Sequence, residues 1–175
     1  MNPGIVPIGF LIGHWVGRGH GRYPTIDPFD YDEDVVLWQV GKPFVGYRQR
    51  TKLAATGLPS HAEDGFWRVA APADGASADP GPGGTGGPIG IEASIAHPTG
   101  LAEILVGTLT GQRIEVATST VACTPTAKEV LGVERVIEVD GDELTYEVRM
   151  AAVGQAMQFH LHGEMRRVDD VPQGG

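Results

Sequence analysis

The chain has 175 residues, of which 41% are hydrophobic and 20% are charged, and its formal net charge is −9. This length suits one domain with a sizeable core. The acidic balance argues against nucleic acid as a partner, because phosphate contacts require clustered Lys and Arg.

Two further features of the composition bear on the class of protein. Cys123 is the only cysteine, which excludes an internal disulfide and a Cys-rich metal site. No apolar run approaches the length of a membrane span, so we expect no membrane segment. The apolar patch at residues 5–12 lacks a basic leader and is interrupted by Pro7 and Gly9, so it does not read as a secretory signal. We therefore expect a cytoplasmic protein.

The first expected strand contains glycine at every second position. Because a strand turns alternate side chains to one face, Gly17, Gly19 and Gly21 lie on the same face as Trp15 and Tyr23. Such a bare strip is kept where another backbone, a sharp barrel bend or a ligand approaches closely. The spacing alone favours neither a ligand surface nor a bent barrel strand without a ligand.

The rest of the chain reads as short strands bounded by turn residues. Pro24 and Pro28 are expected to end the first strand and begin a turn. Strands are then predicted at residues 32–40, 44–54, 60–70, 89–96, 101–109, 113–119, 133–139, 144–150 and 157–168. Helix is limited to residues 8–12 and a short turn near Thr126. About ten evenly spaced strands favour a closed up-and-down barrel or a sandwich, and a barrel of this size can enclose a ligand cavity.

One segment differs in composition from the rest. Residues 72–88 hold six glycines and four prolines and no side chain larger than Asp. Such a segment buries too little apolar surface to offset its ordering entropy, so we predict a disordered loop inserted between two strands.

The histidines are the main candidates for chemistry. None of the six shows a metal-site spacing such as HExxH, and His160 with His162 would need a third ligand to bind zinc, so we expect no zinc site. There is no nucleophile elbow and no dinucleotide fingerprint. Alternation places Phe159 and Leu161 on one face and His160 on the other. His160 therefore faces a cavity only if the interior is polar or a bulge re-aims the strand.

The glycine-rich run at residues 13–24 resembles the GxWxGxGxGxYP signature of the nitrobindin family, with every fixed position present. The last strand, residues 150–167, resembles that family too, as do residues 40–44, 96–100, 125–130 and 140–144. The resemblance implies an all-β fold, a ten-stranded antiparallel up-and-down β-barrel like those of lipocalins and fatty-acid-binding proteins, with minimal helix. It covers residues 1–170 as a single domain, except for the loop at 72–88, and leaves 171–175 as a tail.

The resemblance also implies a function. Nitrobindins bind heme b, isomerise peroxynitrite to nitrate at ferric heme and bind nitric oxide, so these are the small-molecule partners expected. Carried over by position, His160 is the axial ligand of the heme iron. Lys128 is the candidate partner of a heme propionate, and Thr25 and Ile26 are expected on the opposite side of the pocket. The strip of Gly17, Gly19 and Gly21 would let the porphyrin lie close to the first strand.

Other readings stay open from the residues alone. A lipocalin-like carrier of a fatty acid or another apolar molecule would use the same cavity without catalysis. A ligand-free barrel that acts through partner contacts is a third reading. His20 and His162 lie at variable positions of the motifs, and either could approach the iron. Whether the chain forms a homodimer is not given by the sequence.

Overall fold

The computed structural model describes residues 1–71 and 87–168. Most of the predicted loop, residues 72–86, and the predicted tail, residues 171–175, lie outside the described residues. Among the described residues, no helix is both long enough and apolar enough to cross a membrane.

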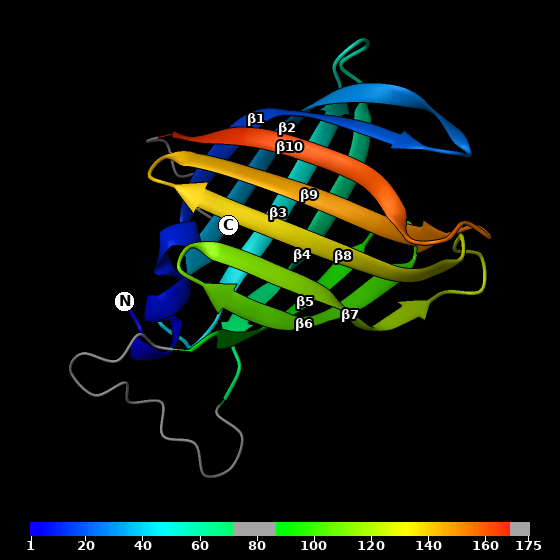
Figure 1. The fold of residues 1–175 in the computed structure, drawn as a ribbon. Helices are drawn as coiled ribbons and strands as arrows, with labels where there is room; N and C mark the ends of the chain where they lie inside the picture. The colour runs from blue at the N-terminus through cyan, green and yellow to red at the C-terminus, as the bar shows by residue number, and fades with distance from the viewer. Residues whose placement is uncertain (72–86, 169–175) are drawn as a thin grey trace.

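In the part of the chain that the structure describes, ten strands form a closed barrel and one short helix accompanies it, which confirms the predicted fold (Figure 1). Each strand pairs antiparallel with its neighbours in the sequence, and β1 closes the barrel by pairing with both β2 and β10. The elements are η1 (Pro3–Leu11), β1 (Gly13–Tyr23), β2 (Ile26–Gln39), β3 (Val45–Leu53), β4 (Pro59–Val69), β5 (Ile89–His97), β6 (Leu101–Thr110), β7 (Arg113–Cys123), β8 (Val130–Asp140), β9 (Glu143–Ala152) and β10 (Gln158–Val168).

The helix η1 is a 3-10 helix and begins earlier than residues 8–12, where a helix was expected. Asn2 caps it, because its side-chain oxygen accepts a hydrogen bond from the Gly4 N–H at 2.9 Å, and Pro3 suits the first helical position. The predicted helical turn near Thr126 is wrong: residues 124–129 form a turn without a helix. The Ala127 N–H donates to the Thr124 carbonyl oxygen at 3.1 Å, and Pro125 suits the second position of this turn because its ring fixes φ at about −65°.

The strand β2 also differs from the prediction, because it begins at Ile26 and not at residue 32. Only Pro24 and Thr25 form the turn after β1. Pro28 stays inside β2 because it lies where the β1–β2 register shifts, between the Gly21–Phe29 and Tyr23–Ile26 pairs. A missing N–H is tolerated at such a bulge.

The glycine strip of β1 is filled by neighbouring protein groups. A Cβ atom on Gly17 would lie 2.0 Å from the Glu164 carbonyl oxygen on β10. A Cβ atom on Gly19 would lie 2.3 Å from the ring of Tyr31, and one on Gly21 would lie 2.5 Å from the ring of Phe29. The alternate glycines therefore allow β10 to approach closely and two aromatic rings of β2 to lie against β1.

The interior is apolar at the end near η1 and carries buried polar groups farther along the barrel. The helix η1 lies at one end of the barrel (Figure 1), where the fully buried Ile5, Ile8 and Leu11 join the core with Trp15 and Trp67. Farther along the barrel, six polar or charged side chains of the described residues lie on the inner faces of the strands and are less than 9% exposed: Glu33, Gln49, Thr51, Glu63, Glu103 and Arg135. The fold thus places polar groups inside a barrel that is closed by apolar packing at one end.

Candidate functional site: a half-polar cavity in the barrel

The barrel encloses a cavity of about 460 Å³. This volume lies within the roughly 300–1,000 Å³ typical of sites for small ligands and cofactors. Apolar side chains such as Val35, Leu37, Trp67 and Met165 line the end near η1, and the polar side chains named above line the middle. A cavity of this kind can hold a flat, largely apolar ligand and present a few polar groups to it.

His160 reaches the cavity because β10 bulges at this residue. In the β9–β10 ladder Phe159 pairs with Arg149 and Leu161 pairs with Val148, so His160 is the extra residue of the shift. A bulge changes the direction of the following side chains, and both His160 and Leu161 line the cavity. The bulge explains why His160 lines the cavity, although simple alternation would place it on the opposite face of the strand.

The imidazole of His160 is held by two neighbours from β1. Its ring lies 5.3 Å from that of Tyr23, edge to face. The Tyr23 hydroxyl accepts the Ala152 N–H at 2.9 Å and so fixes the ring. The Nδ1 atom of His160 lies 3.4 Å from the Arg22 carbonyl oxygen, a long hydrogen bond. Burial lowers the pKa of His160. The contact with the Arg22 carbonyl oxygen raises the pKa, but burial is the larger effect. The imidazole is therefore held neutral, with Nε2 available as a donor of a lone pair.

The other residues predicted for the site are placed differently. Ile26 and Lys128 both line the cavity and are both exposed, so they lie at its rim. Thr25 is an exposed turn residue next to Ile26 and is not among the lining residues. The three glycines of the strip are not among them either, since the rings of Phe29 and Tyr31 and the β10 backbone lie against the strip.

His20 and His162 face each other across the β1–β10 ladder, with ring centroids 5.4 Å apart. Neither is among the residues that line the cavity. His20 is exposed, and the Nε2 atom of His162 lies 3.3 Å from the Glu164 carboxylate. In this structure His160 is thus the histidine of β10 that reaches the cavity.

A buried ionic cluster crosses the middle of the barrel. Arg135 on β8 donates to both oxygens of Glu63 on β4, at 2.8 and 3.0 Å, and to Glu103 on β6 at 3.1 Å. Tyr47 also donates to Glu63, at 2.9 Å. Although burial raises the pKa of the Glu63 carboxyl, Arg135 and the nearby His61 outweigh burial and hold the pKa well below its usual value. Burial also raises the pKa of Glu103, but His97 and Arg135 outweigh burial and lower it, so both carboxylates are ionised around one guanidinium.

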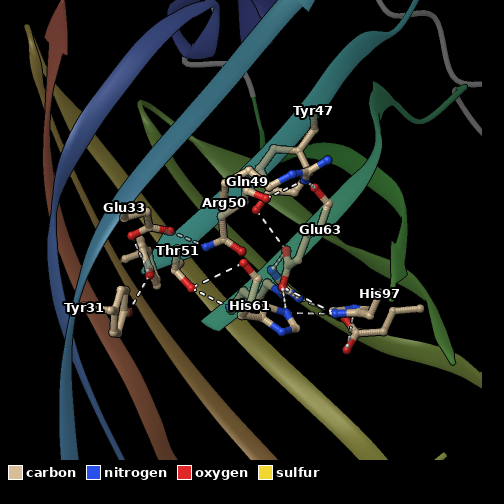
Figure 2. Close-up of polar contacts among 12 residues, drawn as sticks. Tyr31, Glu33, Tyr47, Gln49, Arg50, Thr51, His61, Glu63 and His97 are labelled. Carbon is tan, nitrogen blue, oxygen red and sulfur yellow. Dashed lines mark hydrogen bonds and ion pairs between the residues drawn. The ribbon is translucent and has the colours of Figure 1, made fainter. Parts of the chain in front are cut away.

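A second polar group lies beside the first, on the β2 and β3 side of the cavity (Figure 2). Tyr146 donates to Glu33 at 2.7 Å, the Tyr31 hydroxyl lies 2.7 Å from that of Tyr146, and Gln49 donates to Glu33. Burial raises the pKa of Glu33 to about 7, although the hydrogen bonds from Gln49 and Tyr146 lower it. This carboxyl therefore changes its charge near neutral pH.

His61 and His97 complete the polar lining. The backbone N–H of His61 donates to the Thr51 hydroxyl at 2.9 Å. This contact lies where the β3–β4 register shifts, between Arg50 and Lys52. His97 ends β5, and its side chain is 5% exposed.

The sequence interpretation did not identify these buried polar groups. The signal was present, since alternation puts Glu33 on the same face of β2 as Val35 and Leu37.

Comparison with known proteins gives three findings. A model of the THAP4-like, heme-binding β-barrel domain matches residues 4–167. Two relatives, each 44% identical over 171 residues, are Peroxynitrite isomerase 1 of Mycolicibacterium paratuberculosis and Peroxynitrite isomerase 2 of Mycobacterium avium. In both cases the match covers 95% of this chain and 96% of the relative.

Solved structures agree with the fold. The crystal structure of Rv2717c from M. tuberculosis is similar with a TM-score of 0.82 and 41% identity, covering 96% of this chain and 99% of that one. The S-type phycobiliprotein lyase CPES from Guillardia theta matches with a TM-score of 0.58 at 6% identity, which supports the barrel fold alone.

Proposed function

Because the chain belongs to the family of THAP4-like, heme-binding β-barrel domains, we propose that it binds one heme b in the barrel cavity and isomerises peroxynitrite to nitrate. Nitric oxide is proposed as a second small ligand of the same site. The observation that carries the proposal is the β10 bulge, which directs the His160 imidazole into a cavity of about 460 Å³.

The residues of the cavity fit a heme. A neutral imidazole is a common axial ligand of heme iron, and His160 offers one whose other nitrogen faces the Arg22 carbonyl oxygen. Ile26 and Leu161 supply apolar surface near this histidine, and Lys128 supplies a positive charge at the rim, where it would pair with a propionate. We also propose that Thr25, in the turn beside Ile26, contacts the rim of the group.

The role proposed for the glycine strip is indirect. Gly19 and Gly21 seat the rings of Tyr31 and Phe29, which themselves line the cavity. Through these rings the strip would set the width of the space next to β1. Substituting either glycine would push an aromatic ring into the cavity.

When bound, a ferric heme would supply a redox-active metal centre for the isomerisation of peroxynitrite. His160 would hold this group through its imidazole, whose pKa is lowered by burial. Tyr23 fixes the plane of the ring by the edge-to-face contact. Because peroxynitrite and nitrate contain the same atoms and carry the same charge, the reaction requires no external electron donor.

The test is a stopped-flow measurement of peroxynitrite decay with the hemin-reconstituted chain, followed by determination of nitrate and nitrite. We expect faster decay and a higher nitrate fraction than with the heme-free chain, and loss of both effects in His160→Ala. Decay equal to that of the heme-free chain would overturn the proposal. In that case a colourless purified protein from which a fatty acid can be extracted would identify an apolar carrier.

Two smaller proposals concern the surroundings of the protein. Cys123 is exposed and unpaired, which supports a reducing, cytoplasmic location. The net charge of −9 supports a small molecule, and not nucleic acid, as the partner.

A further inference from the structure

Three side chains in the wall of the cavity form a compact group apart from His160. His61 and Glu63 lie two positions apart on β4, so they share the inner face of that strand. Asp64 pairs with Ala96 in the β4–β5 ladder, which brings Glu63 next to His97 at the end of β5. Figure 2 shows the side chains of His61, Glu63 and His97 pointing toward one another.

The distances within this group match those between the ligands of a metal ion. The Nε2 atom of His61 lies 3.1 Å from Nδ1 of His97 and 3.4 Å from Oε1 of Glu63, and Nδ1 of His97 lies 3.7 Å from the same oxygen. Tetrahedral zinc with bonds of about 2.0–2.1 Å has ligand atoms roughly 3.3–3.4 Å apart. The three atoms therefore form one face of a tetrahedron of this size.

We propose that His61, Glu63 and His97 bind a divalent transition-metal ion, zinc or a metal of similar preference, with its fourth position open to the cavity. Two imidazoles and one carboxylate are a known protein ligand set for zinc with an open position. His160 is not one of its ligands, and the distances among the three ligand atoms do not depend on the heme proposed there.

A carboxylate behind His97 supports this assignment. The Oε1 atom of Glu103 lies 3.5 Å from Nε2 of His97, the nitrogen on the far side of the ring from the cluster. Histidines that bind metals commonly direct their second nitrogen to a carboxylate, which fixes the tautomer with the lone pair on the metal side. In this structure Nε2 of His97 is buried and has no hydrogen bond of good geometry, and a shift of about half an ångström would give it one with Glu103.

The charges of the buried cluster also favour a cation. Glu63 and Glu103 contribute two negative charges, and Arg135 contributes one positive charge. Arg135 donates to Oε2 of Glu63 through Nη1 at 2.8 Å and to Oε1 through Nη2 at 3.0 Å, and Oε1 also lies near the two histidines, where its second lone pair can bind a metal. A net negative charge inside a barrel is unfavourable, so a cation between the imidazoles compensates it.

The experiment is a calorimetric titration of the full chain with ZnCl₂, with zinc and iron in the desalted protein measured by mass spectrometry. We expect one zinc ion per chain, with at least tenfold weaker binding in His61→Ala. Glu103→Gln keeps all three ligands and is expected to weaken binding by roughly ten- to a hundredfold, as losses of a carboxylate behind a ligating histidine do.

His160→Ala is the matched control, because it removes a cavity histidine that is outside the triangle. It is expected to lose iron and to keep zinc, so failure of the heme proposal and failure of the zinc proposal give different results. An anomalous difference map at the zinc edge should show one peak between the three ligand atoms. Equal zinc affinity in the parent and in a folded His61→Ala variant would overturn the proposal.

Discussion

Arg135 is the residue whose removal tests the buried ionic cluster most sharply. It is 8% exposed and donates to Glu63 and Glu103, which are 5% and 3% exposed. Arg135→Met keeps the aliphatic bulk and leaves two buried carboxylates without their cation. Breaking a buried ion pair by removing one partner destabilises proteins by about 3–5 kcal/mol. For a chain of this length we expect a fall of roughly 6–20 °C in the melting temperature.

The pKa shifts of Glu63 and Glu103 fix the direction in which the stability difference changes with pH. In the parent, the pKa values of Glu63 and Glu103 are lowered in the folded state, so their stabilising effect is complete above the unfolded pKa and is lost as the pH falls. Without Arg135, burial raises both pKa values, and the variant loses stability as the pH rises. The difference in free energy of unfolding between parent and variant should therefore increase from pH 4 to pH 7.

The assay is urea unfolding followed by tryptophan fluorescence at several pH values. The matched control adds Glu63→Gln and Glu103→Gln to Arg135→Met, because amides leave no buried charge, and it should recover most of the lost stability. A loss below about 1 kcal/mol, well under the range for a broken buried pair, or a loss that does not change with pH, would refute the reasoning.

Two further predictions concern Glu33 and the glycine strip. Because the folded pKa of Glu33 is raised to about 7 from a usual 4.5, this residue should make the protein less stable as the pH rises between those values. Glu33→Gln should flatten that part of the stability profile in urea unfolding at pH 5 and pH 8, and an unchanged profile would argue against a neutral Glu33. Gly19→Ala should destabilise the chain by about 1–3 kcal/mol, since its Cβ atom would lie 2.3 Å from the Tyr31 ring. A Cβ atom on Gly87 would have nothing within 4 Å, so Gly87→Ala is the control. Equal losses of stability in the two variants on thermal unfolding would contradict the close-packing account.

Local pattern predicts most of this fold and little of its interior. Alternation in Leu144, Tyr146 and Val148 and the turn at residues 140–143 predict the β8–β9 hairpin that the structure contains. The extended start of β2 was missed because Pro28 is a strand breaker unless a bulge accommodates it, and a bulge depends on the partner strand.

The residues of the candidate site also differ in how far the local sequence predicts them. His160 was predicted as a site residue from motif resemblance, and the structure places it in the cavity lining. Alternation alone directed its side chain away from the core, because a one-residue bulge in β10 depends on the pairing with β9 and cannot be seen in a single strand. Arg135 pairs with Glu63, 72 positions away in the sequence and on a strand that is not its neighbour in the barrel. Nothing local links these residues or joins His61 to His97, so their clustering needed the closed barrel.

The most direct test of the central claim is a hemin titration of the full chain, followed by its ultraviolet-visible spectrum. His160→Ala is compared with His20→Ala and His162→Ala, which change histidines outside the cavity lining. The account predicts a sharp Soret band in the parent and in the two controls, and its collapse in His160→Ala with partial recovery on adding imidazole. A parent without a Soret band, or a band unaffected by His160→Ala, would contradict heme ligation by His160.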